Sequence, residues 1–310
     1  MKVFNSIEDI NFSDCVVTMG TFDGVHCGHK VVINRLIETG KRLNKPSVVI
    51  TFEPHPRLVL QKNIKGLKLL TIREEKITRL SKMGVDYLLF LPFTYEFSQI
   101  DARSFVENYL VKKLDTKAMV IGYDHHFGRK NGGKPANIED LLKSYNIAVE
   151  RIPEQDVENV AVSSTKIRAA LSDGNIMLAN HLLGYNYTFA GTVVHGNKLG
   201  RTLGFPTANL LLRNSLKMLP ADGVYAVKVK YKLNWLKGML NIGFKPTFKS
   251  RERTIEVHIL DFDKTIYGEV LTIELIDKIR QEKAFNDINE LKKQLTADKD
   301  SVRKRLENNP

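Results

Sequence analysis

Residues 15–29 read CVVTMGTFDGVHCGH, and this stretch decides the fold of the first half of the chain. An apolar strand runs into a loop that contains Gly20 and Gly24, and a helix is expected to begin near Gly28. A strand, a glycine-containing loop and a helix in succession form the unit that binds ligands in open α/β sheets, at the carboxyl end of the strand. The segment therefore predicts an α/β fold and the position of its ligand site.

Three further apolar runs have the same character as residues 16–19, and they lie at 48–52, 87–91 and 118–121. Each is continuously apolar, as expected of parallel strands that are covered on both faces. Helical patterns follow Thr71, with Glu74 as the acid of a capping box, and Asp101. Strands that alternate with helices predict a Rossmann-like, doubly wound α/β domain, which we expect over residues 1–184.

The second half of the chain has a different hydrophobic period. Residues 225–231, 254–260 and 271–275 alternate between apolar and polar side chains, as antiparallel strands with one buried face do. The turn residues between them favour a small β-barrel or a sandwich. A helix capped by Asp287 follows and is expected to pack on the strands. We expect this antiparallel β domain with its C-terminal helix over residues 185–310.

Charge and cysteine content restrict the class of ligand and the compartment. The chain of 310 residues has 47 basic and 35 acidic side chains, which favours a polyanionic ligand such as a nucleotide. The charge is spread along the chain, so it gives little support to a nucleic-acid partner, and no apolar run is long enough for a membrane span. Because Cys15 and Cys27 are the only cysteines and residues 1–14 do not resemble a signal peptide, we expect a cytoplasmic protein.

The loop before the first helix predicts an anion site. Its glycines let the backbone approach a phosphate, and the helix start offers free N–H groups and a positive dipole end. His26 and His29 point to one side of the first turn, where two imidazoles can hydrogen-bond a phosphorus centre as negative charge builds up. Surface histidines on a capped helix are the alternative. A zinc site is disfavoured because the adjacent His26 and Cys27 point apart on a helix. The loop also matches neither the GxGxxG motif of dinucleotide-binding proteins nor the Walker A motif.

The stretch SSTKIR at residues 163–168 suggests a second helix start. Ser163 or Ser164 can cap a helix, and the N–H groups that follow, including that of Thr165, would then face an anion. Arg168 lies one turn further on and can reach phosphate oxygens with its planar guanidinium. An ordinary capped helix is the alternative for this stretch alone. Together with the first loop, it predicts a triphosphate site between two helix starts.

Residues 191–209, GTVVHGNKLGRTLGFPTAN, form a second glycine-rich constellation. Backbone around Gly196 and Gly200, with Arg201, can wrap phosphates, although β-turns and bulges explain isolated glycines equally well. Thr207 and Asn209 project to the same side of an extended segment and offer hard oxygens suited to Mg²⁺. Glu256, on the polar face of its strand, could accept a proton from a substrate hydroxyl or could be a solvated surface residue.

At this point the chain resembles a known family. G-x-F-D-G-x-H-x-G-H and S-S-T-x-I-R are similar to motifs of the nucleotidylyltransferases in bacterial bifunctional riboflavin kinase/FAD synthetases, and G-R-x-x-G-x-P-T-A-N at 200–209 is similar to the riboflavin kinase signature. TFEPHP at 51–56 and IGYDHHFGRKNGG at 121–133 are similar to further blocks, with Glu53 and His125 as departures. The resemblance covers about residues 4–306 and implies both activities, with ATP as co-substrate and FMN and FAD as products.

The resemblance also implies roles for individual residues. It places His26, His29, Ser164 and Arg168 around the ATP triphosphate, Asp124 and Gly122 near the nucleotide or flavin, and Glu256 as the base that activates a riboflavin hydroxyl. Further phosphate-binding residues are expected at Gly20, Phe22, Asp23, Gly24, Gly28, Ser163, Thr165, Gly196, Gly200 and Arg201. Mg²⁺ is expected at Thr207 and Asn209.

Three other functions compete with this interpretation. A nucleotidylyltransferase for another phosphorylated acceptor would not need the PTAN segment. A flavin sensor with one decayed active site would still carry most of the motifs. An RNA-binding regulator would suit the net charge, but basic clusters with interleaved aromatic residues are missing from the sequence.

Overall fold

The computed structural model describes residues 1–60, 66–122, 138–153, 162–196, 199–244, 253–285 and 287–307. The chain divides into two compact units, residues 1–164 and 165–310. Each unit is described separately. None of the helices in the described ranges is long and apolar enough to cross a membrane.

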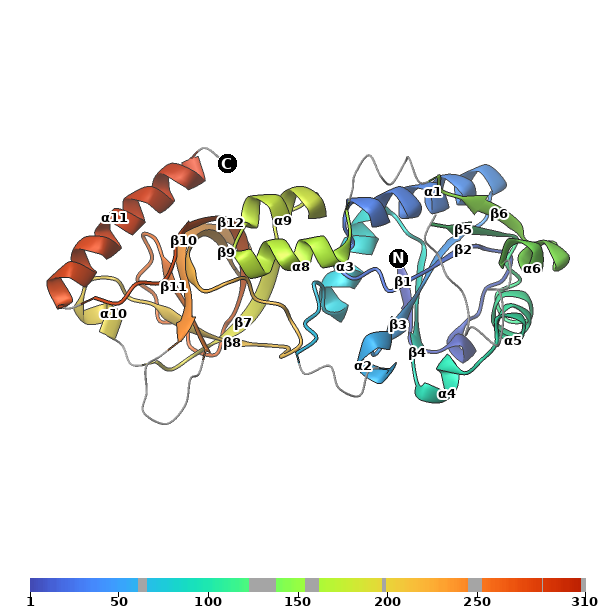
Figure 1. Ribbon diagram of the computed structural model, residues 1–310, viewed down its shortest axis with the longest axis horizontal. Helices are drawn as coiled ribbons and strands as arrows, with labels where there is room; N and C mark the ends of the chain where they lie inside the picture. Colours follow the sequence, from blue (N-terminus) through green and yellow to red (C-terminus); the bar gives the residue numbers. More distant parts are fainter. Residues whose placement is uncertain are drawn as a thin grey trace. The chain divides into compact units, whose positions relative to one another are not determined.

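The first unit is built on a six-stranded parallel sheet with the strand order β1-β4-β3-β2-β5-β6 (Figure 1). Its strands are β1 (Lys2–Phe4), β2 (Val16–Met19), β3 (Ser47–Glu53), β4 (Tyr87–Pro92), β5 (Ala118–Ile121) and β6 (Ala148–Arg151). The predicted bounds of β2 and β5 are confirmed, and β3 and β4 extend slightly beyond theirs. Strand β2 lies between β3 and β5 in the sheet, and the order of the strands reverses at this point. Sheets of this kind bind ligands at the carboxyl ends of the strands at such a switch point.

Helices cover both faces of this sheet, as the continuous apolar strands predict. They are η1 (Ile7–Asp9), α1 (Cys27–Leu43), α2 (Pro56–Leu60), α3 (Arg73–Met83), α4 (Tyr95–Ser98), α5 (Ala102–Phe105), the π-helical turn η2 (Val106–Val111) and α6 (Ile138–Ser144). On one face Val16 and Val49 pack with Ile33 of α1 and Leu80 of α3. The opposite face packs against η2 and α6. The doubly wound fold is therefore confirmed.

The start of α3 differs in one detail from the prediction. The helix begins at Arg73 with Ile72 as its N-cap, so the third helical position is Glu75, whose carboxylate accepts a 3.2 Å hydrogen bond from the Ile72 backbone N–H. The prediction that Glu74 is the capping-box acid was wrong. It took Thr71 as the cap, whereas the Thr71 hydroxyl accepts a hydrogen bond from the backbone of Gly24.

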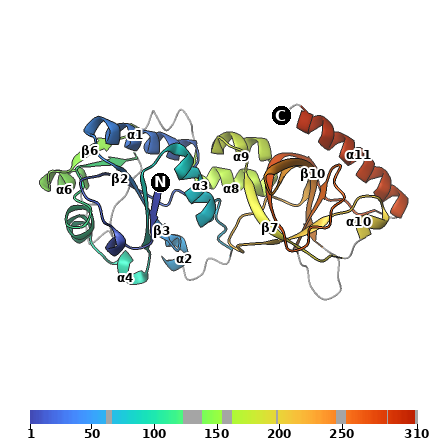
Figure 2. The same ribbon diagram turned by 180° about the vertical axis from the view of Figure 1, so that it is seen from behind.

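The second unit is a closed six-stranded barrel with the strand order β10-β11-β8-β7-β12-β9, seen from behind in Figure 2. Its elements are α8 (Ser164–Asp173), whose first residue belongs to the first unit, α9 (Ile176–Leu183), β7 (Thr188–Val194), α10 (Leu199–Thr202), β8 (Ala208–Leu212), β9 (Gly223–Tyr231), β10 (Asn234–Phe244), β11 (Arg253–Ile259), β12 (Val270–Arg280) and α11 (Ile288–Glu307). Its strands pair antiparallel. Of the two predicted architectures, the barrel is therefore the one adopted.

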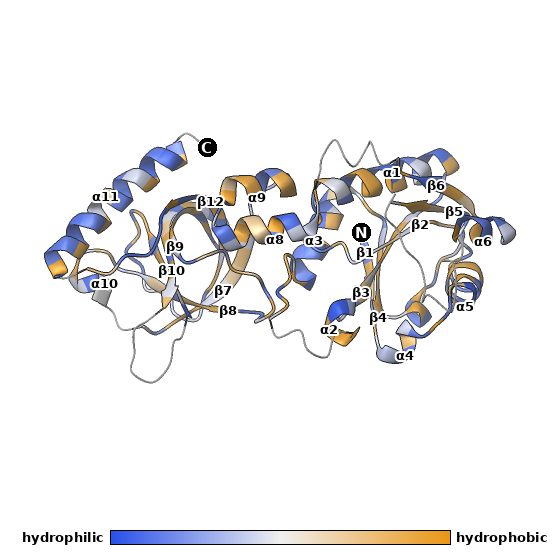
Figure 3. Ribbon diagram, in the orientation of Figure 1, coloured by the Kyte–Doolittle hydropathy of each residue, from blue (hydrophilic) through white to orange (hydrophobic). Residues whose placement is uncertain are grey.

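Helix α11 packs on the outside of the barrel, as predicted. Figure 3 shows that it is mostly hydrophilic, and its apolar contribution is a stripe that includes the buried Val302 and Leu306, which pack with Val224 and Met239 of the barrel. Asp287 caps its start by accepting hydrogen bonds from the N–H groups of the next helical residues. The predicted cap is confirmed.

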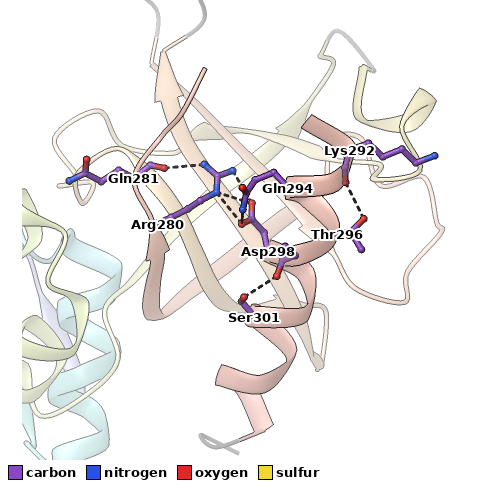
Figure 4. A network of polar contacts seen from close by, with 8 residues as sticks. Arg280, Gln281, Lys292, Gln294, Thr296, Asp298 and Ser301 are labelled. Carbon is purple, nitrogen blue, oxygen red and sulfur yellow. Dashed lines mark hydrogen bonds and ion pairs between the residues drawn. The ribbon is translucent and has the colours of Figure 1, made fainter. Parts of the chain in front are cut away.

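A buried ion pair fixes the helix to β12 (Figure 4). The guanidinium of Arg280 donates three hydrogen bonds of 2.8–3.0 Å to the carboxylate of Asp298, whose side chain is 2% exposed. The amide of Gln294 donates a fourth, at 2.8 Å. A buried carboxylate needs hydrogen-bond donors and an opposite charge. Arg280 and Gln294 supply them to the Asp298 carboxylate, which α11 buries against the barrel.

Candidate functional site

The chain leaves β2 through a strained loop. Phe22, Gly24 and Val25 all have positive φ angles, of 45°, 91° and 39°. Phe22 and Val25 have side chains that disfavour this region, and such strain persists where the surroundings over-determine the backbone. At Gly20 an added Cβ would lie 3.3 Å from the Phe22 ring, so a side chain there would crowd the loop.

Thr71 and Asp23 hold this loop in place. The carboxylate of Asp23, 3% exposed, accepts a 3.0 Å hydrogen bond from the Thr71 backbone N–H. The Thr71 hydroxyl in turn accepts one of 2.9 Å from the N–H of Gly24. Asp23 was expected among the phosphate-binding residues. The structure shows a buried carboxylate that braces the loop from within, and its expected contact with a phosphate stays a prediction.

The two predicted histidines are brought together at the start of α1. His26 is the N-cap, and its Nδ1 accepts a hydrogen bond of 3.3 Å from the backbone N–H of His29. The two rings are stacked with centroids 3.6 Å apart, and Phe22 meets the His29 ring edge-on at 5.2 Å. Because Nδ1 of His26 is an acceptor, its Nε2 carries the proton in the neutral ring. Gly28, buried in the first turn, lies between them in sequence.

His29 is held in its neutral form. Burial lowers its pKa well below the ordinary value, and the nearby His26 and Lys76 lower it further. Its Nδ1 is buried and has no hydrogen-bond partner within the described ranges. Buried polar nitrogens are nearly always paired, so this atom is suited to a water molecule or a ligand oxygen.

The first residue of α8 contacts the same loop. The hydroxyl of Ser164 donates a hydrogen bond of 2.9 Å to the backbone carbonyl of Asp23. The sequence therefore correctly predicted that the SSTKIR stretch and the first loop meet. Ser163 precedes the helix, and Thr165 and Arg168 lie in its first turns. The approach of Arg168 to the phosphates stays a prediction.

The flavin-contact predictions fall at the end of β5. Gly122 directly follows Ile121, the last residue of that strand, and β5 pairs with β2. Gly122 therefore lies at the carboxyl edge of the sheet, the same edge from which the loop with Gly20 emerges. Asp124 and His125 lie outside the described residues.

In the second unit, strand register aligns three polar residues. Glu256 of β11 is the Cα partner of Asn209 on β8 and of Asn241 on β10. Directly opposed residues in antiparallel strands project to the same face, so the three side chains form one row. All three are half-buried, whereas the neighbouring Val257 and Leu240 are fully buried on the other face.

Thr207 completes this row. Its hydroxyl donates a hydrogen bond of 3.3 Å to the carboxylate of Glu256. One residue earlier, the Pro206 carbonyl lies 2.8 Å from Nδ1 of His258, which therefore carries a proton. His258 is 5% exposed, so it holds the PTAN segment against β11 from within the barrel wall. The predicted grouping of Glu256, Thr207 and Asn209 is thus present.

Two glycines make room for these side chains. A Cβ at Gly196 would lie 2.1 Å from Nδ2 of Asn209, and a Cβ at Gly200 would lie 2.3 Å from the carbonyl of Phe205 and 3.4 Å from the Thr207 hydroxyl. Gly200 therefore requires glycine because backbone stands in the way, whereas at Gly196 an added Cβ would displace the Asn209 amide. Arg201 is exposed on the short helix α10, three residues before Gly204, where φ is 83°.

The donor set in this row suits a hard cation. Hydroxyl, amide and carboxylate oxygens are the ligands that Mg²⁺ prefers, and here they come from Thr207, Asn209 and Glu256. The Gly196 backbone leaves a fitted space for the Asn209 amide. The residues present therefore fit a magnesium ion held beside the Glu256 carboxylate.

Sequence reasoning missed several residues of both sites. Thr71 was interpreted only as a helix start, and Asn241 becomes visible only through strand register. Lys76 carried a usable signal, because it lies four residues before the fully buried Leu80 and therefore on the core-facing side of α3. A charged residue on an apolar stripe is a candidate functional group.

The fold and the two sites define a class of protein. A doubly wound unit with paired histidines on an anion loop, and a separate barrel with a carboxylate in a row of hard oxygen donors, are the parts of a nucleotide-dependent transferase with two reaction centres.

Comparisons with known proteins name the family. A family model described as FAD synthetase matches residues 9–166, and one described as riboflavin kinase matches residues 183–306. The bifunctional riboflavin kinase/FMN adenylyltransferase of Buchnera aphidicola (strain APS) is 39% identical and that of Listeria monocytogenes 40% identical. The alignments cover 96% and 93% of this chain and 95% and 91% of the relatives. This chain belongs to the family of bifunctional riboflavin kinase/FMN adenylyltransferases.

A solved structure also shares the architecture. A Streptococcus pneumoniae crystal structure, described as a macrolide-efflux protein, is 34% identical with a TM-score of 0.86, and the match covers 97% of this chain and 98% of that one. Its description differs from the names of the curated relatives, which agree with both family models. The likeness supports the two-unit fold.

Proposed function

We propose that this chain converts riboflavin to FMN and FMN to FAD, with ATP as co-substrate in both steps. The riboflavin kinase reaction belongs to the barrel and the adenylyl transfer to the doubly wound unit, with the functional division after residue 184. The observation that carries the proposal is the presence of two separate constellations, each matched by its own family model. No membrane partner is needed for these reactions, and a cytoplasmic location accords with the presence of riboflavin, FMN and ATP as small soluble substrates.

In the kinase reaction, Glu256 acts as the general base. Its carboxylate accepts the proton of the terminal ribityl hydroxyl as that oxygen attacks the γ-phosphorus of ATP, and the bond between the γ-phosphorus and the β,γ-bridging oxygen breaks to release ADP. Thr207 and Asn209 would hold Mg²⁺, which when bound neutralises phosphate charge. Gly196 and Gly200 lie beside this row, and together with Arg201 they would line the phosphates with backbone and guanidinium donors.

In the adenylyl transfer, the chain positions reactants and stabilises charge. A phosphate oxygen of FMN attacks the α-phosphorus of ATP, and pyrophosphate leaves. His26 can donate from Nε2, and the backbone at Gly24 and Gly28 shapes the anion site. Ser164 is fixed to the loop through Asp23, and Arg168 is assigned to the leaving pyrophosphate. Gly122 and Asp124 are assigned to the flavin or nucleotide.

The test uses purified protein with riboflavin, Mg²⁺ and ATP, and follows FMN and FAD by chromatography. Both products are expected, with FMN appearing first. FMN without FAD would refute the assignment of the first unit. Tight flavin binding without turnover would refute both reactions and support a sensor. Replacing riboflavin with other phosphorylated acceptors checks that the adenylyl acceptor is FMN.

A further inference from the structure

A buried lysine lies beneath the anion loop of the first unit. Lys76 of α3 is only 7% exposed, and its ammonium donates a 2.7 Å hydrogen bond to the backbone carbonyl of Thr21 and a 3.1 Å bond to the hydroxyl of Thr51. The Thr51 hydroxyl itself donates to the Thr21 carbonyl at 3.2 Å. The lysine thus connects the loop to β3 and α3 at one point.

This contact falls where the loop backbone is most strained. Thr21 immediately precedes Phe22, the first of the residues with positive φ. Thr71 fixes the far side of the same turn through Asp23 and Gly24. Strained backbone of this kind persists only where its surroundings hold it, because such conformations are costly on their own. Lys76 is therefore one of the anchors that hold the anion loop, together with Thr71 and Ser164.

No carboxylate of the described residues forms an ion pair with Lys76, whose ammonium also lies 5.9 Å from the centre of the Phe90 ring. Burial lowers the pKa of Lys76 to about 8, against the opposing influence of Asp23 and Glu53, while Arg73 lowers it further. Glu53 is itself ion-paired with Arg73, and Asp23 is already occupied by Thr71. The charge of Lys76 also lowers the pKa of the nearby His29. A buried cation in such surroundings is stabilised by an incoming anion.

We propose that Lys76 is a positioning residue of the adenylyl-transfer site, which fixes the loop through Thr21 and adds positive charge beneath the ATP phosphates. The inference rests on the proposed function of the first unit. The phosphates attract the ammonium form, so ATP binding near pH 8 is accompanied by proton uptake. As pH rises above the pKa of about 8, the charge is lost from the free protein and the apparent affinity for ATP falls.

The test compares K76M, K76R and K82M with the wild type. Lys82 is exposed on the same helix and is the matched control. For FAD formation from FMN, K76M is expected to raise the KM for ATP by about tenfold or more and to lower kcat, because a preorganised charge is lost. K76R keeps the charge and is expected to recover part of the affinity. Riboflavin phosphorylation by the same samples is expected to be unchanged.

A second measurement needs neither turnover nor FMN. Calorimetric titration of ATP in buffers of different ionisation enthalpy, at a pH of about 8, measures the protons taken up on binding. At this pH about half of the Lys76 side chains already carry the proton, so the wild type and K82M are expected to take up about half a proton per ATP that K76M does not. Equal proton uptake and equal KM for ATP in K76M and the wild type would overturn the inference. A wild type that forms FMN without FAD would refute the proposed function of the first unit, while the calorimetry still tests Lys76.

If circular dichroism shows that K76M does not fold, the pH dependence of the wild type alone tests the role of Lys76. Its kcat/KM for ATP in FAD formation is then expected to fall above a pH of about 8, the point at which the lysine loses its charge. A flat profile through this range, with no proton uptake on ATP binding, would overturn the inference.

Discussion

Ser164 and Asp23 lie 141 positions apart in the sequence, and the hydroxyl of one donates a 2.9 Å hydrogen bond to the backbone carbonyl of the other. The bond joins the first residue of α8 to the braced loop after β2. Each motif taken alone is equally compatible with an ordinary capped helix. Their contact joins the two motifs in the folded chain, as the proposed triphosphate site requires.

The S164A substitution is expected to weaken adenylyl transfer selectively. Loss of a hydrogen bond of this kind costs about 1 kcal/mol, so kcat/KM for FAD formation should fall roughly fivefold. Riboflavin phosphorylation should not change. S144A, at an exposed serine of α6, is the control, and an equal loss in S144A would argue against a specific role for Ser164.

The H29A substitution is expected to abolish most FAD formation while FMN formation continues. Removal of one preorganised group that faces developing charge lowers kcat by a factor on the order of 10². Chromatography of both products in one reaction measures the two activities together. Loss of both activities in a folded H29A protein would contradict the assignment of separate sites.

The depressed pKa of His29 gives a pH prediction. Its imidazole should remain neutral as pH falls from about 7 to 6, where an ordinary histidine becomes charged. The unfolded chain binds that proton and the folded chain does not, so His29 makes the first unit less stable as pH falls through the ordinary histidine pKa. An NMR titration of the unliganded protein should show a His29 ring signal that does not move in this range. A transition near 6.5 would contradict the burial of this ring.

The E256Q substitution tests the second unit. It keeps the shape and removes the base, so FMN formation should fall by a factor on the order of 10²–10⁴. FAD formation from supplied FMN should survive. E307Q changes an exposed glutamate at the end of α11 and should leave both reactions intact.

The sequence was sufficient for those parts of the fold that depend on local pattern. Strands β2 and β5 were predicted to the residue because a continuous apolar run has few other interpretations. The start of α3 was misplaced because Thr71 looks like a helix cap, and only the folded chain shows that its hydroxyl serves Gly24, 47 positions away.

The candidate sites were less predictable than the strands, because more of their geometry depends on contacts between residues that are distant in sequence. His26, His29 and the PTAN segment are short-range patterns, and their geometry followed from their spacing. The alignment of Asn241 with Glu256 depends on the register between β10 and β11, which no local pattern determines. Likewise, the loop with the positive φ angles of Phe22 and Val25 is held by Thr71, which precedes α3, and by Lys76 of α3, and no local pattern reveals these contacts.

The ion pair that fixes α11 offers a stability prediction. D298A would leave the Arg280 guanidinium without its partner beneath the helix, and breaking a buried pair in this way costs about 3 kcal/mol or more. Denaturant unfolding should show this loss. D300A, at an exposed aspartate of the same helix, should show little change. A D298A protein as stable as the wild type would mean that the apolar stripe and the ion pairs of Arg303 with Asp261 and Arg305 with Asp277 suffice to hold α11.

The G196A substitution tests whether Gly196 serves the kinase site by leaving space for the Asn209 amide. The added Cβ would meet only the end of the Asn209 side chain, 2.1 Å from Nδ2, so the protein should fold and the amide should be displaced. If Asn209 holds the magnesium ion, the KM for magnesium–ATP in FMN formation should rise about tenfold, and N209A should have a similar effect. The double variant should then be no worse than either single variant, because both remove one interaction. Additive losses would show that Gly196 acts on the phosphates independently of Asn209.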